Sequence, residues 1–276
     1  MFAKVAAFEL RYQLRQPLFW IVTAIFFLMA FGITASNVIR IGGVGEVHRN
    51  SPSMLSMLHL ITGLFFMFVT TAFVAGAVLK DDDTGFGPIV RTTRLNKFDY
   101  LYGRFCGAFA AACIAYLSVT FAALLGGFAP WLDPELVGPF RPVDYLYAYG
   151  ILGLPALFLT ASLFFAVATV TRSMGWTFVG VIAFVIGYIV VNIVLGKPEY
   201  EAAVARWEPF GIGAYQYVTR YWTVADSNSL NPPLTGLLLF NRLFALGLGA
   251  VFLALAYPLY RLRAAPAGQR QRPERA

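Results

Sequence analysis

Long apolar stretches separated by short polar ones make up most of the chain. A helix needs roughly 20 mostly apolar residues to cross about 30 Å of hydrocarbon. Six stretches meet this requirement: 18–37, 57–79, 105–129, 146–170, 174–195 and 236–260. The pattern predicts an all-α integral membrane protein with six transmembrane helices. The first stretch begins too far from the N-terminus and is too long for a usual signal peptide, so we expect the protein to retain it.

The residues before the first stretch predict a short amphipathic helix over 2–16. On a helix, one side would carry Ala3, Ala6, Ala7, Leu10 and Leu14, and another would carry Lys4, Arg11 and Arg15. Such a helix suits the membrane interface. A simple extension of the first span is the alternative, because Pro17 can either break a helix or occupy its first turn.

Two polar segments stand out from the apolar background. Residues 196–236 mix Tyr and Trp with charged residues, which predicts interfacial helices with aromatic side chains at headgroup level. Residues 264–276 form a basic tail that contains Pro and is typical of disorder. We therefore divide the chain into a membrane domain, 1–263, and a disordered tail, 264–276.

Composition and charge agree with a membrane protein and predict its orientation. The 276 residues are 59% hydrophobic and 13% charged, whereas a soluble domain carries about 25% charged residues. Fourteen of the 21 Lys and Arg residues fall on the side of the termini, which predicts that both termini are cytoplasmic. The net charge of +7 is explained by this topology and by anionic lipid headgroups, so it does not call for a nucleic-acid partner.

Few residues offer catalytic or metal-binding chemistry. The chain has two histidines, His48 and His59, and neither the zinc-protease pattern H-E-x-x-H nor a phosphate-loop motif. For His59 we favour a hydrogen-bonded imidazole near a helix end over a metal ligand. The carboxylates of Asp81–Asp83 could gather Mg²⁺, but consecutive side chains on a helix point in different directions. Cys106 and Cys113 lie roughly 10 Å apart along one predicted helix, too far to bridge.

Ionisable residues inside the spans would mark an ion path, and the spans have almost none. Arg242 is nearest, and we expect it to snorkel outward or to pair with an acidic group of the outer loop. Gly103 and Gly107 form a GxxxG step at which we expect close helix packing.

The stretch "KDDDTGFGPIVRTTRLNKFDYLYGRF" (80–105) resembles the first cytoplasmic loop of the ABC-2 type permeases. In that family an acidic residue, "TG", a hydrophobic pair and a basic motif lead into the third helix. The matching positions here are Asp83, Thr84, Gly85, Ile89, Val90, Thr93, Leu95, Lys97, Tyr100, Leu101, Gly103 and Arg104. "EPFG" (208–211) and "TRYWTVADSNS" (219–229) also resemble a subgroup whose longer members are fused to an M1-type zinc aminopeptidase domain. That peptidase half is missing here, and Asp83 stands where many relatives have Glu.

The resemblance implies an exporter-type (type V) transmembrane domain with an N-terminal interfacial helix. It also implies a multi-pass subunit of the bacterial inner membrane that works as a homodimer or heterodimer with two separate ABC ATPase subunits. ATP and Mg²⁺ would be bound by those subunits, and we expect no cofactor and no enzymatic activity in this chain. Two alternatives stay open: a membrane enzyme with a metal at Asp81–Asp83, and a scaffold subunit that does not transport.

Within this interpretation, residues 80–105 form a cytoplasmic docking surface for the ATPase. A break at Gly85–Pro88 would start a short helix that presents Phe86, Ile89 and Val90 as apolar anchors, with a polar rim of Arg91, Arg94 and Lys97. The alternative is a positively charged loop that only fixes the topology.

Overall fold

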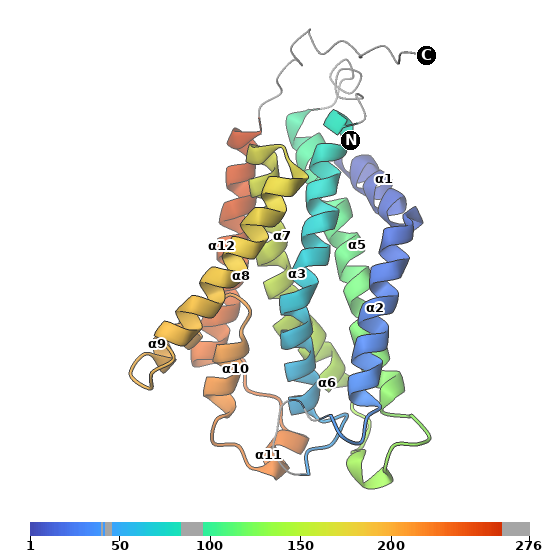
Figure 1. The fold of residues 1–276 in the computed structure, drawn as a ribbon, viewed down its shortest axis with the longest axis vertical. Helices are drawn as coiled ribbons and strands as arrows, with labels where there is room; N and C mark the ends of the chain where they lie inside the picture. Colours follow the sequence, from blue (N-terminus) through green and yellow to red (C-terminus); the bar gives the residue numbers. More distant parts are fainter. Residues whose placement is uncertain (40, 42–45, 84–95, 261–276) are drawn as a thin grey trace, which may run out of the picture.

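The computed structural model describes residues 1–39, 41, 46–83 and 96–260, and of residues 81–83 it describes only the backbone. Every regular element among them is a helix. Six are long and apolar enough to cross a membrane, which confirms a multi-pass helical membrane protein. The spans form one elongated bundle, with α1 beginning and α12 ending at the same end of it (Figure 1). We call this the terminal end and the opposite one the far end.

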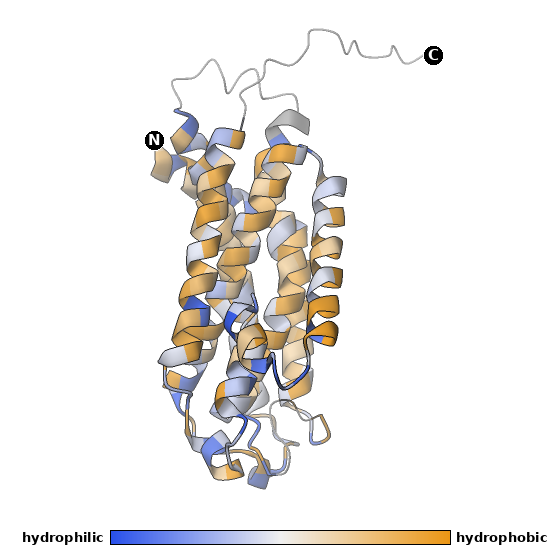
Figure 2. Cartoon of the chain, turned by 90° about the vertical axis from the view of Figure 1, so that its left-hand side faces the viewer, coloured by the Kyte–Doolittle hydropathy of each residue, from blue (hydrophilic) through white to orange (hydrophobic). Residues whose placement is uncertain are grey.

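The six spans occupy the predicted places but begin and end at residues other than those predicted. They are α2 (Pro17–Thr34), α3 (Pro52–Asp83), α5 (Lys97–Gly126), the continuous helix of α6 (Pro142–Leu146), η2 (Tyr147–Gly153) and α7 (Leu154–Thr171), α8 (Met174–Val194) and α12 (Gly236–Leu259). Figure 2 shows apolar residues along the spans and polar residues gathered at the far-end loops.

The third span begins at Lys97, not at residue 105. Residues 97–104, which the sequence assigned to the loop before the third span, are therefore part of the membrane helix. The helix can continue through Arg104 because the fold supplies a buried carboxylate beside this residue. The preceding residues, 84–95, include the Gly85–Pro88 break and lie outside the described residues, as does the tail 264–276.

The N-terminal helix, α1 (Phe2–Arg15), is separate from the first span. Gln16 has extended backbone angles, φ −76° and ψ 134°, and Pro17 takes the first position of α2. The prediction of a distinct helix is confirmed, and the alternative of a continuous extension is wrong. Pro explains the break, because it disfavours helical geometry in the residue before it.

The far end is covered by short elements. Residues 134–136 form a 3-10 turn, η1 (Pro134–Leu136). The long segment after α8 forms three helices, α9 (Glu201–Trp207), α10 (Ile212–Thr219) and α11 (Val224–Ser229), in agreement with the helices predicted there. The bundle interior is packed with Phe, Ala and Leu, and both cysteines are free, as expected from their spacing.

Candidate functional site

A buried cluster of charges lies at the terminal end, where α1 meets α3 and α5. Glu9 of α1 is fully buried, and its carboxylate accepts a hydrogen bond from the guanidinium of Arg104 of α5. The Lys80 ammonium of α3 lies 3.8 Å from the same carboxylate oxygen. The side-chain amide of Gln13 donates to the other oxygen at 2.8 Å. One carboxylate therefore joins three helices.

Aromatic rings lie beside the two cations, Lys80 and Arg104. The Lys80 ammonium lies 3.0 Å from the centroid of the Tyr12 ring. The Arg104 guanidinium lies 5.6 Å from the centroid of Phe8 and 5.5 Å from that of Tyr100. Cations over aromatic faces are stabilised by the negative face of the ring, most strongly when water is excluded. The cluster is thus built to hold charge in a poorly hydrated place.

The GxxxG step on α5 allows α1 to approach closely. A Cβ atom at Gly107 would lie 2.6 Å from the Cβ of Glu9 and 3.0 Å from the backbone nitrogen of Leu10. A Cβ atom at Gly103 would lie 2.8 Å from the Cβ of Val5. The predicted close packing is confirmed, and its partner is α1. The two glycines and Glu9 therefore fasten the same pair of helices.

The predicted docking residues are placed only in part. Phe86, Ile89, Val90, Arg91 and Arg94 lie outside the described residues, as do the side chains of Asp81–Asp83. Lys97 is the first residue of α5, and its ammonium lies 4.5 Å from the ring centroid of Tyr257 and 5.9 Å from that of Tyr260. Lys97 therefore contacts the end of α12.

Arg242 on α12 is the centre of a second buried cluster, toward the far end. It is 3% exposed, and its guanidinium donates to the carbonyls of Leu152 at 2.9 Å and Phe210 at 3.1 Å. The expectation that Arg242 snorkels outward is wrong. Leu152 lies in the π-helical turn η2, and wide π turns of this kind often occur at functional sites.

The acidic group near Arg242 is Glu208, at the end of α9. Its carboxylate accepts hydrogen bonds from the backbone nitrogens of Phe210 at 3.0 Å, Gly211 and Gly213 at 3.3 Å, at the start of α10. Burial raises the pKa of Glu208, while the charge of Arg242 and the backbone N–H groups oppose the rise. The charges of Arg242 and Glu208 therefore act on each other, while the hydrogen bonds of the Arg242 guanidinium go to Asn241 and to the carbonyls of Leu152 and Phe210.

The "EPFG" segment is the turn that forms this cluster. Gly211 has φ +88°, a left-handed conformation that favours glycine, and a Cβ there would overlap the Arg242 guanidinium. Asn241, beside Arg242, donates its amide to the carbonyls of Ala205 at 3.0 Å, Arg206 at 3.1 Å and Glu208 at 2.7 Å. These hydrogen bonds connect the end of α9 to α12.

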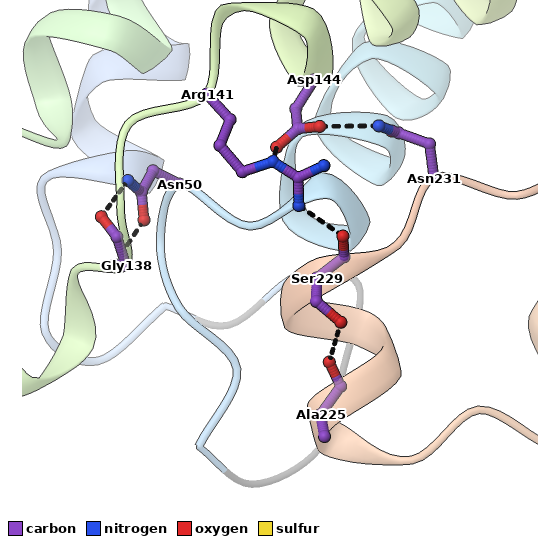
Figure 3. Close-up of polar contacts among 7 residues, drawn as sticks. All are labelled: Asn50, Gly138, Arg141, Asp144, Ala225, Ser229 and Asn231. Carbon is purple, nitrogen blue, oxygen red and sulfur yellow. Dashed lines mark hydrogen bonds and ion pairs between the residues drawn. The ribbon is translucent and has the colours of Figure 1, made fainter.

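The loops of the far end are tied to one another (Figure 3). Asn50 exchanges two hydrogen bonds with the backbone of Gly138, at 2.7 and 2.8 Å. Arg141 pairs with Asp144 at 3.5 Å and donates to the carbonyl of Ser229. Asn231 donates to Asp144 at 2.6 Å. The loop before α3, the loop before α6 and the segment after α11 therefore form one connected cover.

His59 is hydrogen-bonded on both sides of its ring. Nδ1 lies 2.8 Å from the carbonyl oxygen of Leu55, and Nε2 lies 2.9 Å from the hydroxyl of Thr120. Because a carbonyl only accepts, the proton belongs on Nδ1, and Nε2 accepts from Thr120. The favoured interpretation of a hydrogen-bonded imidazole is confirmed.

Comparison with protein-family models and with curated proteins gives no match for this chain. The fold defines the protein as a multi-pass helical membrane protein, and the resemblance to ABC-2 permeases stays a prediction from sequence motifs.

Proposed function

We propose that this chain is the membrane-spanning half of an exporter-type ABC transporter. Two such halves would enclose the path of the cargo and work with two separate ATPase subunits. In this proposal the terminal end faces the cytoplasm of a bacterial cell, as the distribution of Lys and Arg predicts. Residues 84–95, between α3 and α5, would then receive the ATPase.

The observation that supports the proposal most is the position of the Glu9 cluster. Residues 84–95 connect the end of α3 to the start of α5, and Lys80 and Arg104 lie on these two helices. Glu9 holds both cations and fastens α1 to the same junction. A displacement of the connecting segment would therefore move three helices as a unit, which suits a subunit that is driven mechanically by a separate protein.

The outward faces of two spans leave room for a second half. α8 is the least enclosed span, and Ile182, Ile186 and Ile193 project from it as exposed apolar side chains. α2 is the next least enclosed. A symmetric dimer buries such faces against a copy of the same chain or a related one. Membrane lipids would cover whatever the dimer leaves open.

The proposal is tested with a variant that removes two proposed apolar anchors, Phe86→Asp/Ile89→Asp. The matched control, Thr92→Asp/Asn96→Asp, adds the same negative charge to the same region and keeps both anchors. After co-purification from the membranes of the source organism, ATP hydrolysis and the amount of bound ATPase are measured. We expect the first variant to insert normally but to lose ATPase binding or stimulation, and the control to keep both. Equal binding and stimulation in both variants would contradict the docking assignment.

A further inference from the structure

An elongated groove of about 500 Å³ lies between α8 and α9 on the outside of the bundle. α8 leans away from the other spans toward the end where α9 lies (Figure 1). The α8 wall runs from Phe184 to Leu195, which corresponds to about 16 Å of helix at 1.5 Å per residue. This length is close to half of the roughly 30 Å hydrocarbon thickness, or one leaflet.

The wall formed by α9 is held rigidly. Trp207 lines the groove, and its ring meets those of Phe240 and Phe244 of α12 edge-on, with centroids 5.2 and 4.9 Å apart. The three hydrogen bonds of Asn241 fix the backbone of the same segment. The groove is therefore a built feature and does not depend on a loosely attached helix.

The groove offers almost no free polar group to a ligand. The amide of Asn192 donates to the carbonyl of Tyr188 at 2.8 Å. The carboxylate of Glu208 is taken up by the backbone nitrogens at the start of α10. The rest of the lining is mainly apolar, including Val191, Leu195 and Val204. A water molecule needs two to four polar partners, so water does not fill such a space stably.

We propose that the groove binds one acyl chain of a membrane phospholipid. The occupant must be mainly apolar, because the lining is mainly apolar and the Asn192 amide and the Glu208 carboxylate are bonded within the protein. It must be linear, because the groove is long, and the bilayer beside the groove, which lies on a different face of α8 from Ile182, Ile186 and Ile193, supplies such chains. Tyr188, Tyr200 and Trp207 line the same groove, and such aromatic residues favour headgroup level. The lipid headgroup would lie beside Tyr200 and Trp207, with its chain running along α8 past Tyr188.

Gly187 provides a variant that fills the groove without disturbing the fold. It lines the groove, and a Cβ atom added there would meet nothing within 4 Å. Gly247 of α12 is equally open but does not line the groove, so Gly247→Leu is the matched control for Gly187→Leu. Both substitutions place the same side chain on the surface of a span.

The test uses the full chain in nanodiscs that contain phosphatidylcholine with a photoreactive diazirine in one acyl chain. After irradiation, labelled peptides are mapped by mass spectrometry. We expect labelling of 184–209 to exceed that of exposed α2, to fall about fivefold in Gly187→Leu, whose side chain fills the groove, and to be unchanged in Gly247→Leu. Equal labelling of α2 and α8, as annular lipid gives, would overturn the proposal. Labelling of 184–209 by a diazirine-bearing free fatty acid, but not by the phosphatidylcholine, would also overturn the proposal. No ATPase is needed, and the comparison of Gly187→Leu with Gly247→Leu does not depend on whether α2 lies in a dimer interface, so this arm can fail without the proposed function failing.

Discussion

Glu9→Gln removes the charge that joins α1 to α3 and α5 and keeps the shape of the side chain. In the native protein the Glu9 carboxylate is fully buried and faces the cations of Arg104 and Lys80. A glutamine amide can still accept from Gln13, but it no longer balances two positive charges. We expect α1 to separate from the bundle more often, while the spans stay inserted.

The magnitude follows from the burial of the partners. Removing one member of a buried ion pair costs about 3–5 kcal/mol, because the other charge stays desolvated. The side chain of Arg104 is 7% exposed and that of Lys80 is 20% exposed, and both cations keep their aromatic neighbours when the carboxylate is lost. We therefore take the lower end, about 3 kcal/mol, which corresponds to roughly a hundredfold increase in the opening equilibrium of α1.

Hydrogen exchange measured by mass spectrometry follows this opening directly, because the amides of 2–15 exchange when α1 detaches. Arg11→Gln is the matched control, since Arg11 is an exposed cation on the same helix. In a double-mutant cycle with Arg104→Gln, we expect a coupling energy of about 2 kcal/mol. Exchange of 2–15 within about twofold of wild type in Glu9→Gln, or an equal effect of Arg11→Gln, would refute the reasoning.

Three further predictions concern packing, orientation and pH. Gly107→Ala should destabilise the folded chain by about 1–3 kcal/mol in thermal unfolding because its Cβ overlaps α1, whereas Gly247→Ala meets open space and should not; equal effects would contradict this. In a background without the native cysteines, Tyr221→Cys, at an 83% exposed position, should react with an impermeant reagent outside intact cells and Thr92→Cys should not; the reverse would overturn the orientation. Burial raises the pKa of Glu208, so the folded chain binds this proton more tightly than the unfolded chain, and stability should fall as pH rises above the ordinary pKa of a glutamate; Glu208→Gln should flatten that slope, and an unchanged slope would contradict the assignment.

The spans could be predicted from the sequence because bilayer thickness imposes their length and apolar composition. Their ends could not, because a charged residue ends an apolar pattern but not necessarily a helix. Arg104 illustrates the difference: the sequence places it before the third span, and the fold neutralises it inside α5. The carboxylate that does so, Glu9, lies 95 residues away along the chain, and local periodicity carries no information about such a pair.

The cluster around Arg242 could be predicted from the sequence in part, whereas the Glu9 cluster could not. Arg242 was recognisable as an unusual charge within a span, and an acidic loop residue was an expected partner. Its buried position depends on the hydrogen bond to the Leu152 carbonyl in the π-helical turn and on the left-handed Gly211, and hydrophobic patterning predicts neither. The "EPFG" segment was noticed as a family resemblance, whereas its role in forming the turn before α10 follows from the hydrogen bonds of Glu208.

The most direct test of the proposed function is the composition of the complex purified from native membranes in mild detergent. Native mass spectrometry gives its subunits, and ATP hydrolysis is measured on the same sample. The proposal predicts two membrane halves, each this chain or a related one, together with two subunits that carry a phosphate-loop motif and hydrolyse ATP. A stable monomer that is active without any ATPase subunit would contradict it.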